Sequence, residues 1–307
     1  MKKLLYIALS LLTLVGLGGQ ARAENSLLFG QRHYYSVTFR SNGEAIVMAR
    51  IVISNSETTD LSSLQFDTGD DKISELSAFQ MILPPACEKY VYNGTNICEK
   101  YGDPDYATTY SYNPDGDQIK YYRLKTSENQ NDNKISVELN QPIVANKSGA
   151  VILSYVSKSY VGRNMLGLRH YNFRTLGAEK RQAETNVAIS VDSGLSIHGN
   201  NNSYCCIYPL AASTKDMAVM SGSSESGSTP IENSTFDSVV AGIGSGGQRN
   251  EKATGIAPHE QFSFKGEYAD KAWKLYVCWI LLSLITLALV ILALTWLIRK
   301  IIHRRKK

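Results

Sequence analysis

The sequence predicts a mainly β protein, in which an antiparallel β-sandwich ectodomain, one large or two packed, precedes a single C-terminal transmembrane helix. Short runs of alternating apolar and polar residues recur along the chain, separated by Asn, Asp, Gly, Ser and Pro, which is typical of a sandwich. No long run of helical period lies between them. Residues 275–298 form a stretch of 24 residues without a charge, long enough to cross a bilayer as a helix.

Residues 1–23 have the pattern of a secretory signal peptide. A basic start with Lys2 and Lys3 precedes an apolar run over 4–17, and an A-x-A cleavage site ends at Ala23. We therefore expect a type I single-pass protein with the β-sandwich ectodomain over 24–198.

The net charge of +4 comes from the two ends of the chain and reflects the predicted membrane topology. Subtracting the +3 of the signal peptide and the +6 of residues 299–307 leaves −5 for residues 24–298. Nucleic-acid binding needs clustered Lys and Arg, so this mildly acidic remainder indicates no nucleic-acid partner.

The clearest local structure is a hairpin within 33–53. Tyr35, Val37 and Phe39 share one face of the first run, and alternate residues from Ala45 to Ile53 share one face of the second. Asn42-Gly43 stands between the two runs and is typical of a tight hairpin turn in which both residues take a positive φ.

Further strands are expected along the rest of the ectodomain, with a short helical turn near Asp71–Phe79. The expected strands are Leu61–Phe66, Ala78–Leu83, Gln118–Leu124, Ile135–Leu139, Ala150–Ser157, Asn186–Val191 and Gln261–Tyr268.

Residues 84–122 read as an insertion or a set of hairpin loops rich in tyrosine and bearing two cysteines. Four cysteines outside the membrane allow three pairings, and we expect a Cys87–Cys98 disulfide. Whether Cys205 and Cys206 are bridged stays open. Tyrosine suits recognition surfaces and also favours strands. The possible recognition surface comprises Tyr90, Tyr92, Tyr101, Tyr106, Tyr110 and Tyr112.

The C-terminal third is expected to pass from a flexible region into the membrane. Residues 199–258 are rich in Ser, Gly and Asn and are predicted to be a flexible loop or linker, and 259–274 to be a final strand and juxtamembrane segment. The aromatic residues expected at the membrane interfaces are Trp273, Tyr276, Trp279 and Trp296. The basic tail 299–307 contains Arg299, Lys300, Arg304, Arg305, Lys306 and Lys307 and is predicted to be cytoplasmic.

No catalytic, cofactor or metal site is predicted. The sequence has no C-x-x-C, H-E-x-x-H or G-x-S-x-G motif, and its histidines stand in no recognisable catalytic arrangement. We therefore expect a chain that is not an enzyme.

The segments YYSVTFRSNGEAIVMARIVISN and VILSYVSKSYVGR, with YNFRTLGAEK and TNVAISVDSGLSIHG, resemble the β-rich outer domains of ribophorin-I-like membrane proteins and of uncharacterised bacterial single-pass proteins. The resemblance covers residues 33–54 and 150–200. It implies a β-rich domain in a non-catalytic membrane protein and assigns no functional residue.

The prediction for function is a membrane-anchored extracytoplasmic protein of the cell surface or envelope that binds or scaffolds. Its partners would be the lipid bilayer and a protein or glycan outside the plasma membrane. A non-catalytic structural subunit of a membrane complex is the alternative, and an extracellular hydrolase is a weaker one.

Overall fold

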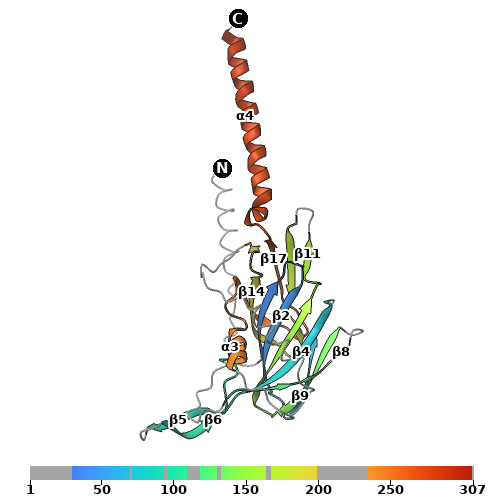
Figure 1. Cartoon of the computed structure of the whole chain (residues 1–307), viewed down its shortest axis with the longest axis vertical. Helices are drawn as coiled ribbons and strands as arrows, with labels where there is room; N and C mark the ends of the chain where they lie inside the picture. Colours follow the sequence, from blue (N-terminus) through green and yellow to red (C-terminus); the bar gives the residue numbers. More distant parts are fainter. Residues whose placement is uncertain are drawn as a thin grey trace, which may run out of the picture.

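The structure, a computed structural model, describes residues 30–69, 71–92, 96–108, 118–129, 133–163, 167–198 and 234–305. Several predicted features lie outside these residues: the signal peptide, Tyr110, Tyr112, Cys205, Cys206, Lys306 and Lys307. The described chain is mainly β and ends in one long apolar helix, as predicted (Figure 1).

The strands are β1 (Gln31–Phe39), β2 (Ala45–Ser54), β3 (Leu61–Asp67), β4 (Ile73–Ile82), β5 (Ala86–Tyr92), β6 (Asn96–Gly102), β7 (Lys120–Arg123), β8 (Lys125–Asn129), β9 (Lys134–Ile143), β10 (Ser148–Ser157), β11 (Val161–Arg163), β12 (Arg169–Arg174), β13 (Gly177–Ala178), β14 (Gln182–Val191), β15 (Ser196–Ile197), β16 (Arg249–Ile256) and β17 (Ser263–Ala269). The helices are α3 (Ser234–Gly242), the 3₁₀ helix η2 (Ala272–Tyr276) and α4 (Val277–Arg305).

The largest sheet has seven strands in the order β16-β14-β1-β2-β10-β4-β7. Two four-stranded sheets, β11-β12-β17-β15 and β13-β3-β9-β8, form the opposite layer, and β5 pairs with β6 as a separate ribbon. All pairings between described strands are antiparallel except β1 with β14. The predicted antiparallel sandwich is therefore present, with one parallel pairing between the second and third strands of its large sheet.

The main core lies between the large sheet and the two smaller ones. Alternate residues of β1 and β2 point into it, including Tyr35, Val37 and Ile51, as the sequence pattern predicts. Phe66 from β3 and Phe173 from β12 meet them from the opposite layer. One continuous cluster joins all three sheets, so the β domain has a common core.

The other face of the large sheet is covered as well. Met48 and Val52 on β2 pack in a second cluster with Tyr106 and with Phe236 and Val240 of α3. Covering both faces explains why β2 is buried along nearly its whole length, instead of alternating between core and solvent.

The β1–β2 turn differs from the expected one in its backbone. Gly43 has φ +89°, whereas Asn42 is not among the residues with a positive φ. The Gly43 N–H bonds to the Arg40 carbonyl at 3.1 Å, and the Arg40 N–H bonds to the Glu44 carbonyl at 2.8 Å. This is a three-residue loop with a glycine bulge, and the Asn42 side chain closes it by accepting the Glu44 N–H at 3.0 Å.

Two expectations about secondary structure are wrong. The helical turn near Asp71–Phe79 is instead part of β4, which pairs with β10. The expected flexible stretch 199–258 is contradicted over its second part, where the structure has α3 and β16, whereas residues 199–233 lie outside the described residues. β4, α3 and β16 are all stabilised by contacts with distant parts of the chain, which local composition does not reveal.

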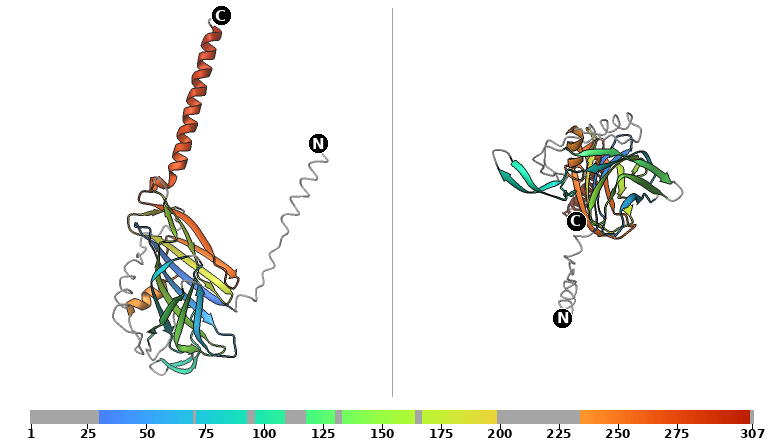
Figure 2. Two further views of the ribbon diagram at one scale, coloured as in Figure 1. Left: turned by 90° about the vertical axis from the view of Figure 1, so that its right-hand side faces the viewer. Right: turned by 90° about the horizontal axis from the view of Figure 1, so that it is seen from below.

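The C-terminal helix projects from one end of the β domain, and the β5–β6 ribbon lies at the opposite end (Figure 1). Seen along the long axis, the ribbon also extends sideways from the body (Figure 2). α4 begins at Val277, two residues after the start of the predicted membrane segment, because Leu275 and Tyr276 belong to η2. Residues Trp279–Arg299 are apolar enough, and at 21 residues long enough, to cross a membrane.

Candidate functional site

The β5–β6 ribbon is largely exposed to solvent. It forms a two-stranded antiparallel sheet that pairs with no other described strand. A disulfide joins Cys87 to Cys98 across the two strands, as predicted. Because an isolated hairpin is only marginally stable in water, this covalent link holds the ribbon in shape where no core supports it.

Large apolar side chains of the ribbon face solvent on both sides. Tyr92 is 76% exposed and Tyr90 is 59% exposed. The further exposed apolar residues on the two strands are Val91, Ile97 and Tyr101. Aromatic and β-branched residues gathered on one projecting element, without a core beneath them, are typical of a protein interaction site.

The charges on the ribbon cancel. Lys89 forms an ion pair with Glu99, and Lys100 forms one with Glu88. All four side chains are largely exposed, so these pairs add little stability. They leave the element without net charge beside its apolar groups, which disfavours an anionic partner and favours an uncharged one.

The predicted tyrosine surface divides into different environments. Tyr90, Tyr92 and Tyr101 lie on the ribbon. Tyr106 is only 6% exposed and packs beneath α3, so it is a core residue and contributes no exposed surface. Its hydroxyl accepts the Leu83 N–H at 3.4 Å, which places the segment after the ribbon against the large sheet.

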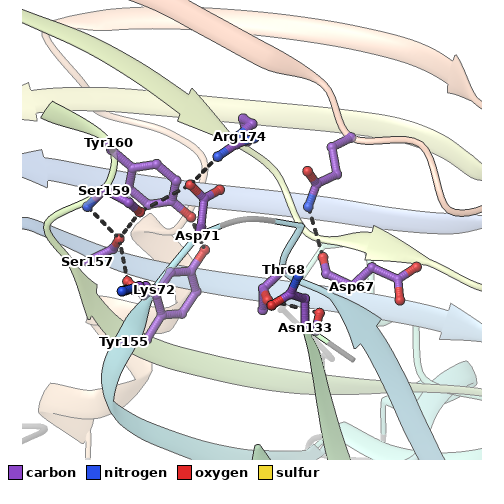
Figure 3. A network of polar contacts seen from close by, with 11 residues as sticks. Asp67, Thr68, Asp71, Lys72, Asn133, Tyr155, Ser157, Ser159, Tyr160 and Arg174 are labelled. Atoms are coloured by element: carbon purple, nitrogen blue, oxygen red, sulfur yellow. Dashed lines mark hydrogen bonds and ion pairs between the residues drawn. The ribbon is translucent and has the colours of Figure 1, made fainter. Parts of the chain in front are cut away.

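A buried polar network lies at the edge of the main core (Figure 3). The Asp71 carboxylate accepts a hydrogen bond from Arg174 at 2.6 Å and one from the Ser159 hydroxyl at 3.1 Å. The Ser159 hydroxyl lies 2.7 Å from the Ser157 hydroxyl, which donates to the Lys72 carbonyl at 2.8 Å. These contacts tie the start of β4 to the end of β10 and to β12.

The network is arranged for structure more than for catalysis. The guanidinium of Arg174 neutralises Asp71, and neither Ser157 nor Ser159 has a histidine partner among the described residues. Burial raises the pKa of the Tyr160 hydroxyl, and the nearby Asp71 charge raises it further. A serine without a base and a tyrosine that stays protonated provide no activated nucleophile.

A second buried chain of hydrogen bonds runs through His33. Its Nδ1 lies 3.0 Å from the Tyr35 hydroxyl and its Nε2 lies 2.9 Å from the Gln31 side-chain oxygen. The Gln31 side-chain oxygen can only accept, so we assign the ring proton to His33 Nε2, and Nδ1 accepts the hydrogen bond of the Tyr35 hydroxyl. The Tyr35 hydroxyl oxygen in turn accepts the Leu176 N–H at 3.0 Å. Burial lowers the pKa of His33 to about 3, which keeps the ring neutral.

Beneath α3, Arg50 is 4% exposed and lies on the outer face of β2. Its guanidinium stands 4.3 Å from the centre of the Tyr34 ring and donates to the Tyr106 carbonyl at 3.1 Å. Next to it, the Tyr121 hydroxyl donates to Asp237 of α3 at 2.7 Å. This cluster attaches α3 and the segment after the ribbon to the large sheet.

Comparisons with known proteins add little. No protein-family model and no curated protein matches the chain. Among solved structures, the M1 zinc metallopeptidase from Deinococcus radiodurans is similar at 13% identity and a TM-score of 0.29, over 55% of this chain and 34% of the peptidase. A mutant of that enzyme bound to a Tyr-Ser-Ala substrate gives 12% identity and a TM-score of 0.29, with the same coverage.

The present chain therefore spans about a third of the length of these peptidases, and TM-scores this low support no inference about fold or activity. Among the described residues, no group of three or more His, Cys, Asp and Glu side chains is placed to hold a metal ion. These matches do not test the resemblance to ribophorin-I-like proteins, which stays a prediction.

The predicted membrane residues are placed along the C-terminal helices. Trp273 and Tyr276 lie on η2, while Trp279 and Trp296 lie near the two ends of the apolar part of α4. All four are exposed, as interface aromatics of a membrane span would be. α4 continues through the start of the basic tail as far as Arg305.

Sequence reasoning missed the partners in both buried networks. Asp71, Arg174 and His33 carry no local motif. The Asp71–Arg174 contact joins segments far apart in the chain, whereas His33 bonds to Gln31 and Tyr35 on its own strand. The one available signal is the alternation of Gln31, His33 and Tyr35, which places three polar groups on the same face of β1.

Proposed function

We propose that this chain is a single-pass, membrane-anchored binding protein that holds its β domain outside the cell and presents the β5–β6 ribbon to a protein partner. The observation that carries the proposal is the position of the ribbon, a disulfide-linked element with exposed aromatics at the end of the domain opposite α4.

The chemistry of the ribbon supports a protein over a charged ligand. Tyr90, Val91, Tyr92 and Ile97 offer apolar and aromatic area, and the neighbouring Lys and Glu side chains neutralise one another. Interface centres are rich in aromatic residues and poor in net charge. The disulfide supports an oxidising compartment outside the cytoplasm.

The orientation is supported by the basic tail. Arg299, Lys300, Arg304 and Arg305 follow the apolar part of α4, and the positive-inside rule places such a cluster in the cytoplasm. The β domain then lies on the outer side, with the ribbon at its membrane-distal end.

Site-specific photo-crosslinking tests this function. A photoreactive amino acid replaces Tyr92 in the full chain expressed in its own cells, and a matched variant carries it at Val144, which is also exposed but lies outside the ribbon. We expect a discrete protein adduct from position 92 that is absent from position 144. The combined change Val91→Ser and Ile97→Ser should abolish that adduct.

The result that would overturn the proposal is the absence of a specific adduct at position 92, or the same adduct from both positions. Adducts that arise only from α4 or η2 would instead favour a structural subunit docked through its membrane segment.

A further inference from the structure

The β domain joins the apolar helix without a linker. β17 ends at Ala269, η2 begins at Ala272, and α4 starts at Val277, directly after η2. β17 is an inner strand of its sheet, paired with β12 on one side and β15 on the other. The direction in which α4 leaves the domain is therefore set by strands of the folded core.

η2 is itself packed against the domain. Leu275 is 9% exposed and forms a small apolar cluster with Leu168 and Ala269. The Tyr276 ring lies 5.6 Å from the His198 ring, and Lys274 pairs with Asp270 at 2.8 Å. These contacts come from different parts of the chain, so the end of the domain at η2 is held close to the start of α4.

Basic side chains lie near η2 in the four-stranded sheet β11-β12-β17-β15. In the strand register, Arg163 pairs with Arg169, which pairs in turn with Tyr268, the penultimate residue of β17. The Arg169 guanidinium lies 5.6 Å from the centre of the Tyr268 ring. Lys271 follows between β17 and η2 and is exposed, as is Arg163. We call Arg163, Arg169 and Lys271 the basic rim.

Three acids lie close to the rim: Asp192 is near Tyr268, and the other two have basic partners. Asp270 pairs with Lys274, and Glu267 lies 3.0 Å from His170. The rim therefore presents positive charge next to Trp273 and Tyr276, which are exposed aromatics of the kind found at the headgroup level of a membrane.

We propose that the basic rim is a binding surface for anionic lipid headgroups, on which the β domain rests. Phosphate groups of the lipids would accept hydrogen bonds from the Arg and Lys side chains, while the η2 aromatics lie at the same depth. The surface is continuous with the apolar part of α4, so inserting the helix brings the rim to the headgroups at no further cost in translational freedom. This inference needs α4 to span a membrane but does not depend on a partner for the ribbon.

Short-range fluorescence quenching tests the proposal in the full chain. The protein has three tryptophans, so Trp279→Phe with Trp296→Phe leaves Trp273 as the reporter beside the rim. The chain is placed in nanodiscs of mixed phosphatidylcholine and phosphatidylglycerol, in which one lipid or the other carries a nitroxide near the headgroup. We expect quenching by the labelled phosphatidylglycerol to be about twofold greater at low salt and to approach that by phosphatidylcholine at high salt.

Charge reversal on the rim provides the decisive comparison. Arg163→Glu with Lys271→Glu should remove the preference for phosphatidylglycerol. The matched control Lys120→Glu with Lys125→Glu changes the same charge at exposed positions of β7 and β8, the second of which lies away from α4 in Figure 1, and should keep the preference. Equal thermal unfolding midpoints would show that both variants are folded. Equal quenching by the two lipids in the parent chain, or an unchanged preference in the rim variant, would overturn the proposal.

Discussion

The buried His33 side chain makes the unfolding free energy of the protein depend on pH. Burial lowers its pKa from an ordinary value of 6.5 to about 3. Between these two values the ring is protonated in the unfolded chain and neutral in the folded chain. The contribution of the neutral ring is complete above pH 6.5 and is lost as the pH falls toward 3.

We expect the unfolding free energy to drop by about 2 kcal/mol between pH 7.5 and pH 5 because of this group. Denaturant titrations of the full chain in detergent at both pH values measure the drop. His33→Asn removes the titrating ring, so its drop should be smaller by that amount, and an identical drop in both proteins would contradict the assignment.

Asp71 and Arg174 should show the asymmetry of a buried ion pair. Asp71→Ala leaves the guanidinium of Arg174 without its charge partner and is expected to cost about 3 kcal/mol of unfolding free energy. The double change Asp71→Leu with Arg174→Met removes both charges and should cost less than Asp71→Ala alone. Chemical denaturation of the three proteins provides the comparison, and a double variant that is less stable than Asp71→Ala would rule out this explanation.

At this scale the sequence predicts some residues well and others not at all. The inward positions Tyr35, Val37 and Phe39 follow from simple alternation, because one face of a strand is buried. The pairing of Asp71 with Arg174 does not, since nothing in either local segment indicates that β4 and β12 approach each other. Tyr106 was assigned to a surface by composition, and its burial depends on the distant helix α3.

The β5–β6 ribbon is expected to respond to reduction without a change in the rest of the domain. A disulfide that closes a loop of this length restricts the unfolded ribbon and so stabilises the folded ribbon by about 3 kcal/mol. Cys87→Ser with Cys98→Ser should therefore raise hydrogen exchange strongly in β5 and β6 while leaving β2 and β10 protected. Equal increases in all four strands would contradict this independence.

α3 is expected to depend on one aromatic side chain. Phe236 packs edge-on against Tyr121 and Phe79, with ring centres 4.5 and 5.5 Å away. Phe236→Ala should cost about 3 kcal/mol through the cavity that it leaves. Val144→Ala, at an exposed site, should change the unfolding free energy by less than about 0.5 kcal/mol. Thermal unfolding of the two variants checks both values, and similar losses would contradict the packing of α3.

Elements with a strong period were predictable, and elements that depend on the fold were not. The β1–β2 hairpin and the strands Leu61–Asp67 and Ser148–Ser157 match strand-like runs in the sequence. β16 has a mostly polar sequence and becomes a strand because β14 offers it an edge. α3 is too short for its period to stand out in a region rich in Ser and Gly.

The orientation of the whole molecule is open to a direct test. If the basic tail is cytoplasmic, a protease added to intact cells should cut the β domain and leave a tag attached after Lys307 protected. Permeabilising the cells should then expose the tag. Cleavage of the tag before permeabilisation, with the β domain protected, would reverse the orientation that we propose.

At the level of the whole molecule, the sandwich and the single apolar helix follow from the sequence, whereas the order of the strands does not. Alternation and turn residues report local structure only. They carry no information that β1 takes β14 as its second neighbour, or that it does so in parallel.

The pairing of β1 with β14 has a consequence for how the protein is made. Gln31 near the start of the described chain pairs with Gln182, and β17 is followed almost at once by the apolar helix. If the β domain is translocated across a membrane, as we propose, the first hairpin emerges early but cannot complete its sheet until β14 has followed it. The last core strand emerges only when α4 is reaching the membrane. On that route, folding of the domain would finish at about the moment of anchoring, and the early-emerging hairpin with its apolar β2 would have to be kept from aggregating until then.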